Sequence, residues 1–157
     1  MMTQEFVIRF FADYAIFLVI LIGTYALIFK VPKGHRLQAY ARVLMAGLLA
    51  YFLAKMIGLI FQPSILRPFE LLGKMAGASF LNNPGFPSDH ILLVAAIVCA
   101  VWFETKQKFI TILLVVLMIA ICIGRVLALV HSPIDVVGGI MIALIGALWY
   151  VNGKNVV

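Results

Sequence analysis

Residues 109–130 read FITILLVVLMIAICIGRVLALV and carry one charged side chain, Arg125. A helix needs about 20 apolar residues to cross a bilayer. In lipid, the backbone polar groups of a segment must be satisfied within that segment. This stretch therefore predicts a membrane-spanning helix rather than a strand or a loop.

Four other stretches have the same apolar character: Phe6–Phe29, Ala39–Phe61, Ser88–Phe103 and Ser132–Val151. With Phe109–Val130 they predict an all-α integral membrane helical bundle of about five transmembrane helices. We expect residues 1–157 to form a single membrane-embedded domain. The long connection 62–87 mixes apolar and charged side chains over residues 67–80, which predicts a short helix lying in the membrane interface.

The composition excludes several other classes of protein. Apolar residues make up 65% of the 157 residues and charged residues only 11%, against roughly 45–50% and 25% in soluble domains. A domain of about 150 residues still leaves about a third of its surface wet, so the apolar excess must face lipid. A soluble enzyme, a disordered linker and a disulfide-stapled secreted module are all excluded. The two cysteines have no metal-type spacing, and we expect no metal and no cofactor.

The net charge of +6 arises mainly from basic residues in the gaps between apolar runs, which favours membrane topology and anionic groups over nucleic acid as the partner. Seven cations fall on one predicted side: Lys30, Lys33, Arg36, Arg42, Lys106, Lys108 and Lys154. Four fall on the other: Arg9, Arg67, Lys74 and Arg125. The excess predicts a multi-pass cell-membrane protein whose N-terminus and second side face outward.

Unusual polar residues gather on that second side. They are Arg67-Pro68, Pro87-Ser88-Asp89-His90, Arg125 and His131-Ser132-Pro133-Ile134-Asp135. Ionisable groups at membrane depth are costly and usually functional. The topology thus predicts a functional site where these stretches meet.

The local chemistry of these stretches favours a phosphate ligand. Ser88 precedes an apolar run and is expected to be an N-cap, while Ser132 and Asp135 have nearly the spacing of a capping box. Two helix N-termini would then face one compartment, and such ends bind anions. Arg67 and Arg125 add two planar guanidinium forks suited to anionic oxygens.

Two histidines predict a reaction at that phosphate. His131 lies four residues before Asp135, so the carboxylate can accept the Nδ1–H and leave Nε2 as a nucleophile. His90, at the start of the other helix, is the candidate general acid. Two alternatives use the same residues: a haem-binding electron carrier with both histidines as axial ligands, and an anion or lipid transporter lined by Arg67 and Arg125.

The same motifs carry a family resemblance. Pro87-Ser88-Asp89-His90, followed by Arg125, five residues, His131, three residues and Asp135, resembles the second and third motifs of the type 2 phosphatidic acid phosphatase superfamily. These are integral-membrane lipid phosphatases related to vanadium haloperoxidases. Arg67-Pro68 resembles the end of the first motif. The stretch 60–140 looks most like the bacterial undecaprenyl-diphosphatases of the bacitracin-resistance type.

The resemblance implies a metal-independent phosphatase with a phosphohistidine intermediate. It makes His131 the nucleophile, Asp135 its orienting carboxylate and His90 the acid. The phosphate-binding residues that it implies are Arg67, Ser88, Asp89 (through its backbone) and Arg125. The implied substrate is a polyprenyl diphosphate, returned as monophosphate to the cell wall synthesis cycle. Phosphatidic acid, phosphatidylglycerol phosphate and a lipid A phosphate are the alternatives within the class.

The sequence also departs from the family pattern. The first-motif lysine position is occupied by Ile60, and Lys55 and Lys74 are the candidates to replace it in space. Gly124 stands where the family often has serine, and Asp89 replaces the commoner glycine. Five spans in place of the usual six predict a shortened N-terminus.

Overall fold

The computed structural model describes residues 2–152, and every regular element in this range is a helix. In chain order they are α1 (Met2–Arg9), the π-helical turn η1 (Phe10–Tyr14), α2 (Ala15–Lys30), the 3-10 turn η2 (Lys33–His35), α3 (Arg36–Ile60), α4 (Pro68–Leu71), α5 (Asp89–Thr105), α6 (Lys108–Leu127) and α7 (Pro133–Asn152). The predicted all-α membrane bundle is confirmed.

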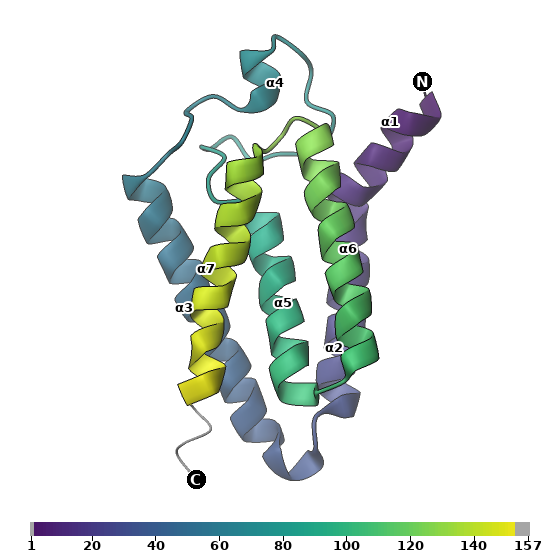
Figure 1. The fold of residues 1–157 in the computed structure, drawn as a ribbon, viewed down its shortest axis with the longest axis vertical. Helices are drawn as coiled ribbons and strands as arrows, with labels where there is room; N and C mark the ends of the chain where they lie inside the picture. The colour runs from purple at the N-terminus through teal and green to yellow at the C-terminus, as the bar shows by residue number, and fades with distance from the viewer. Residues whose placement is uncertain (1, 153–157) are drawn as a thin grey trace.

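Four helical segments of the described residues are long and apolar enough to cross a membrane: Thr3–Lys30, Lys33–Ile60, Lys108–Leu127 and Pro133–Val151. The fifth predicted span, Ser88–Phe103, corresponds to α5, which has 17 residues and rises about 26 Å. Figure 1 shows α5 at the centre of the bundle, and it contacts α2, α3, α6 and α7. This length of α5 is at the short end of the range for a membrane-spanning helix, so the bundle has four long apolar helices around a shorter central one, in line with the prediction of about five.

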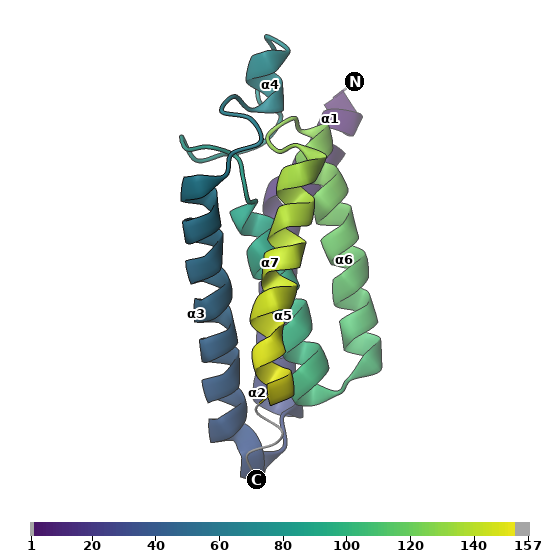
Figure 2. The same ribbon diagram turned by 60° about the vertical axis from the view of Figure 1, so that its left-hand side comes forward.

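The connecting segments divide between two ends of the bundle (Figures 1 and 2). The start of α1, α4, the long connection 61–87 and the α6–α7 turn lie at one end, here called the site pole. The η2 turn, the α5–α6 turn and the end of α7 lie at the other, the opposite pole. The first and last helices therefore place their outer ends at different poles, as an odd number of spans predicts. Lys154, one of the seven cations from which the membrane orientation is predicted, lies outside the described residues.

The first span begins earlier than the predicted Phe6–Phe29. Helix α1 starts at Met2 and continues through η1 into α2. Arg9 and Asp13, although charged, both lie within this helical segment. The π-helical turn inserts an extra residue into the helical ladder, a feature found mostly at functional sites.

Small residues allow the central helices to approach closely. A Cβ added to Gly139 of α7 would lie 2.9 Å from the Ser88 carbonyl oxygen, in contact with α5. One added to Gly146 would lie 2.8 Å from the Ala46 carbonyl oxygen of α3. Such small-residue contacts are typical of helix pairs in membranes. They hold α7 against both neighbours.

The short helix expected within residues 67–80 is α4, which covers Pro68–Leu71. Gly73 has φ +60°, a left-handed conformation that ends a helix. The rest of the connection is fixed by its backbone to the α6–α7 turn: the Phe69 and Gly77 N–H groups donate to the carbonyls of Leu129 (3.0 Å) and Ala128 (2.9 Å). The connection thus lies across the site pole.

Candidate active site

The sequence-predicted residues converge on one cavity at the site pole. Five of them line it: Arg67, Asp89, His90, Arg125 and His131. The connection contributes the remaining lining residues, Leu81, Asn83, Pro84, Gly85 and Pro87. The cavity has a volume of about 30 Å³, room for one or two water-sized groups. The imidazoles of His90 and His131 therefore share one small enclosed space.

The N-termini of α5 and α7 are joined directly by a hydrogen bond. The Ser88 N–H donates to the Asp135 carbonyl at 3.0 Å, and the Ser88 carbonyl accepts the first helical bond from Leu92 at 2.9 Å. Ser88 is the N-cap residue of α5, as predicted, but its side chain makes no capping bond. Its buried Oγ has no hydrogen-bond partner among the described residues. This hydroxyl therefore remains free to bind a ligand.

The start of α7 is fixed by a reciprocal cap. The Ser132 N–H donates to Asp135 Oδ2 at 2.7 Å, and the Asp135 N–H donates to Ser132 Oγ at 3.3 Å. This is the capping-box geometry that the sequence predicts. The cap explains why Asp135, in the first turn of α7, faces back towards Ser132, which directly precedes the helix.

His131 and Asp135 lie side by side without the expected hydrogen bond. His131 Nδ1 is 3.6 Å from Asp135 Oδ2, beyond hydrogen-bond range, and this buried nitrogen has no other partner in the described structure. The carboxylate oxygen instead accepts the Ser132 N–H. Burial lowers the pKa of the His131 imidazole below its usual value, although Asp135 opposes the shift. Burial thus favours the neutral form of the His131 imidazole.

Arg67 ties the long connection to the α6–α7 turn. Its Nη1 donates to the Val130 carbonyl at 2.6 Å, and its Nη2 donates to carbonyls of Leu81 (3.1 Å) and Asn83 (3.0 Å). The guanidinium also lies 5.4 Å from the Phe80 ring centre. Burial lowers the pKa of Arg67 from its usual value, but a guanidinium remains charged in proteins. The positive charge of Arg67 is thus fixed at the carbonyl of Val130, the residue before His131.

Arg125 is the most buried of the cavity's charged side chains, with 1% of its surface exposed. Its Nη1 donates to Asp13 Oδ1 at 3.1 Å and to the Ser79 carbonyl at 3.0 Å. Its buried Nε has no hydrogen-bond partner among the described residues. Sequence reasoning missed Asp13 as part of this site. The available signal was an acidic residue inside an apolar span, which is costly unless it is paired.

The two lysines considered for the first-motif position lie in different surroundings. Lys55 Nζ is 2.9 and 3.0 Å from the two carboxylate oxygens of Asp89, so it stands next to the cavity without lining it. Lys74 is exposed in the turn after α4. Among the described residues, no hydrogen bond or ion pair joins the Lys74 side chain to the site.

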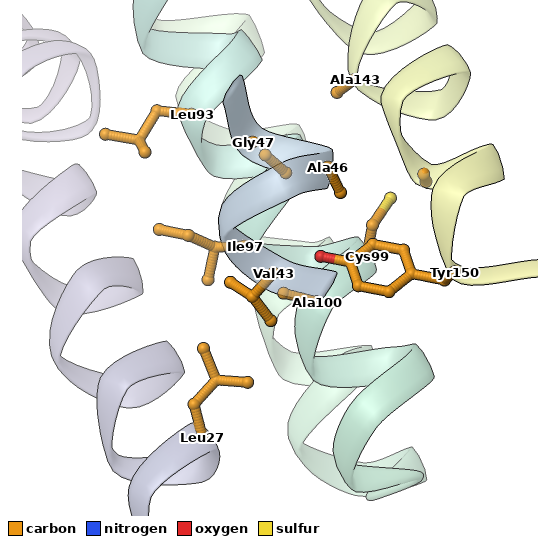
Figure 3. Close-up of a pocket in the computed structure, with 12 residues that line it drawn as sticks. Leu27, Val43, Ala46, Gly47, Leu93, Ile97, Cys99, Ala100, Ala143 and Tyr150 are labelled. Carbon is orange, nitrogen blue, oxygen red and sulfur yellow. The ribbon is translucent and has the colours of Figure 1, made fainter. Parts of the chain in front are cut away.

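An apolar groove continues from the cavity along the central helix. Asp89 and Lys55 line a neighbouring space of about 420 Å³ between α3 and α5. That space shares Gly47, Leu93 and Ala96 with a further cavity of about 150 Å³. Figure 3 shows the latter surrounded by side chains of α2, α3, α5 and α7. The polar cavity therefore lies next to an apolar groove within the bundle.

Comparison with known proteins identifies the family. The model of the PAP2 superfamily matches residues 37–156, which include α3 to α7 and every site residue that the sequence predicts. The chain belongs to the PAP2 superfamily. Membership implies phosphatase activity on lipid phosphates, and the apolar helices make this PAP2 protein a membrane protein. No curated protein and no solved structure matches the chain.

Proposed function

We propose that this PAP2 protein hydrolyses the terminal phosphate of a polyprenyl diphosphate, such as undecaprenyl diphosphate, and releases the monophosphate and inorganic phosphate. One observation carries the proposal: two histidines and two buried arginines line a single small cavity at the end of a membrane bundle. The apolar groove next to this cavity supports a substrate with a long hydrocarbon chain.

In this mechanism His131 is the nucleophile. The position of Asp135 beside Nδ1 leaves Nε2 to attack the terminal phosphorus, while the neutral state favoured by burial keeps its lone pair available. The bond between phosphorus and the bridging oxygen breaks. His90 donates a proton to that oxygen as the lipid monophosphate leaves. Water then attacks the phosphohistidine with His90 as the base, and inorganic phosphate and free His131 are regenerated.

The remaining site residues hold the phosphate. Arg67 and Arg125 supply positive charge, and the unpartnered Ser88 Oγ supplies a donor. The backbone N–H groups of Asp89 and its neighbours at the start of α5 are free to donate to phosphate oxygens, as helix N-termini do elsewhere. Such fixed donors stabilise the charge that develops as the phosphoryl group transfers.

Lys55 takes the place of the first-motif lysine in this proposal. It lies beside Asp89 at the junction of the catalytic cavity and the apolar groove, where the inner phosphate of a diphosphate would sit when the outer phosphate occupies the cavity. Phosphatidic acid, phosphatidylglycerol phosphate and a lipid A phosphate present the same terminal phosphate chemistry and are the alternative substrates.

We further propose that the site pole faces the outside of a bacterial inner membrane. The larger number of basic residues at the opposite pole supports this orientation. It can be measured in cells with a membrane-impermeant maleimide on single-cysteine variants, after Cys99 and Cys122 are replaced by alanine. Lys74→Cys is expected to react from outside, whereas Lys106→Cys is expected to react only after lysis. The reverse pattern would contradict the orientation.

Phosphate release by the purified protein in detergent tests the function. Undecaprenyl diphosphate and phosphatidic acid are compared side by side, with and without EDTA. We expect His131→Ala and Asp135→Ala to abolish release and EDTA to leave it intact. His35→Ala provides the matched control, because His35 is exposed in η2 at the opposite pole. Full activity in the His131→Ala protein would refute the mechanism, and faster release from phosphatidic acid would refute the proposed substrate.

A further inference from the structure

The guanidinium of Arg125 is fixed from one side only. Three acceptors surround its Nη1: Asp13 Oδ1 at 3.1 Å, the Ser79 carbonyl at 3.0 Å and the Ala12 carbonyl at 3.3 Å. Because a guanidinium is planar and rigid, fixing Nη1 restricts the direction of every other N–H group. Nε, which is buried without a partner among the described residues, is then held in one direction within a side chain that lines the cavity.

Asp13 is the only charged member of this set of acceptors, and its other contacts hold it firmly. Its carboxylate accepts the Ser79 N–H at 3.0 Å and the Ser79 Oγ–H at 2.7 Å. Only 9% of its side chain is exposed. Asp13 therefore links three segments that are distant in the sequence: the first helix, the long connection and the end of α6.

The fold brings Asp13 to Arg125 by two local features. Asp13 lies in the π-helical turn η1, and this turn packs on α6 beside Gly124. A Cβ added to Gly124 would lie 2.9 Å from the Ala12 nitrogen and 3.0 Å from the Phe11 carbonyl carbon, closer than side chains tolerate. The glycine at 124 thus permits the contact between the first helix and α6.

We propose that Asp13 is a positioning residue of the active site, which acts through Arg125 by holding its guanidinium in the orientation that binds phosphate. Asp13 lies in the first helix, outside residues 37–156 that match the family model, so the first helix is part of the catalytic apparatus as well as a membrane span. This inference rests on the proposed function, because it assigns a phosphate to Arg125.

The direction in which anion binding changes on loss of the Asp13 carboxylate distinguishes a positioning role from a purely electrostatic one. If the Asp13 carboxylate were a bystander, its removal would take a negative charge away from the site and strengthen anion binding. If it positions Arg125, its removal weakens anion binding although the site becomes more positive. Asp13→Asn is the suitable change, because asparagine keeps the size of the side chain and one acceptor oxygen for Ser79.

The matched control is Glu104→Gln. Glu104 pairs with Arg42 through hydrogen bonds of 2.7 and 2.8 Å, with 5% of its side chain exposed, at the opposite pole. Both variants neutralise a nearly buried carboxylate paired with arginine, but only one does so at the site. Measured in detergent, we expect Asp13→Asn to lower kcat/KM for phosphate release about 10–100-fold and to raise the inhibition constant of inorganic phosphate about tenfold. Glu104→Gln should change neither by more than about twofold.

A double-mutant comparison tests whether Asp13 acts through Arg125. In an Arg125→Lys background the guanidinium is absent, so Asp13→Asn should then change the inhibition constant less than about threefold. A full tenfold effect in that background would show that Asp13 acts by another route and would overturn the inference. An unchanged or lower inhibition constant in the single Asp13→Asn variant would overturn it as well.

If Asp13→Asn does not fold, Ser79→Ala removes the 2.7 Å hydrogen bond to Asp13 and keeps both charges. It should raise the same inhibition constant a few-fold, and no change would overturn the inference. Measurements on the wild-type protein distinguish a failure of the positioning role from a failure of the proposed function. If it releases phosphate and both site variants behave like it, the positioning role alone is wrong. If it neither releases nor binds phosphate, the proposed function is wrong and this inference with it.

Discussion

The contact between α5 and α7 can be tested by adding one methyl group at Gly139. In Gly139→Ala the new Cβ would lie 2.9 Å from the Ser88 carbonyl oxygen and 3.2 Å from the Leu92 nitrogen. Ordinary contacts begin at 3.4 Å, so the helices must separate by about 0.5 Å at the point where Ser88 hydrogen-bonds to Asp135. This movement shifts His131 relative to His90, since the two histidines lie at the starts of these helices.

The expected loss of activity follows from that displacement. A misplacement of about 1 Å costs about 100-fold in rate, so half that distance corresponds to about tenfold in kcat/KM. Added volume in a packed core also costs about 1–3 kcal/mol of stability. Phosphate release and thermal unfolding of the same detergent preparation measure the two effects separately.

Gly146→Ala supplies the control on the same helix. Its Cβ would lie 2.7 Å from the Ala50 Cβ and 2.8 Å from the Ala46 carbonyl oxygen, a worse clash, but against α3 and two turns farther from the site. We expect Gly146→Ala to lose at least as much stability as Gly139→Ala while keeping most of its activity. A Gly139→Ala protein as active as the Gly146→Ala protein would refute the link between this helix contact and the alignment of the histidines.

Three further predictions concern charged groups. Because burial lowers the pKa of His131 and the neutral imidazole is the proposed nucleophile, activity should persist as the pH falls to the usual histidine value of about 6.5. An acid limb of kcat/KM with its midpoint above that value would contradict this. Lys55→Met should raise KM about tenfold, because it leaves the Asp89 carboxylate unpaired beside the substrate phosphate, and Asp89→Asn in the same protein should restore much of the loss. Glu104→Gln should lower the free energy of unfolding by about 1–3 kcal/mol, because Arg42 loses a nearly buried partner. Chemical denaturation of the variant measures this loss, and its rate of phosphate release should equal that of the wild-type protein.

The sequence predicts those parts of the fold that depend on local rules. Apolar runs of bilayer length give the long helices, and the spacing of Ser132 and Asp135 gives the cap of α7. The spacing of Arg125, His131 and Asp135 around a short turn brings them to one pole. The predicted span Ser88–Phe103 is the shortest of the five in the sequence, but its apolar residues do not reveal that the other helices surround it.

The features that sequence reasoning missed depend on contacts between distant residues or on competing local signals. The partner of Arg125 is Asp13, 112 positions away, and no spacing rule links them. The hydrogen bond from the Ser88 N–H to the Asp135 carbonyl joins residues 47 positions apart. Helix α4 ends at Leu71, although the mixed apolar and charged pattern continues to residue 80. Gly73, which has a left-handed backbone conformation, is a helix stop signal that the sequence does contain.

The position of the site follows from where the helices end. Ser88 stands directly before α5, where free backbone N–H groups of the first turn offer donors to an anion without removing a hydrogen bond from the helix. Arg125 and Asp13 differ, because both lie within helical segments that extend into the membrane. A lone charge there is unfavourable, but each supplies the other's counter-ion at 3.1 Å. Their mutual neutralisation makes a buried arginine tolerable at the proposed phosphate site, and it requires the first helix to pack against the end of α6.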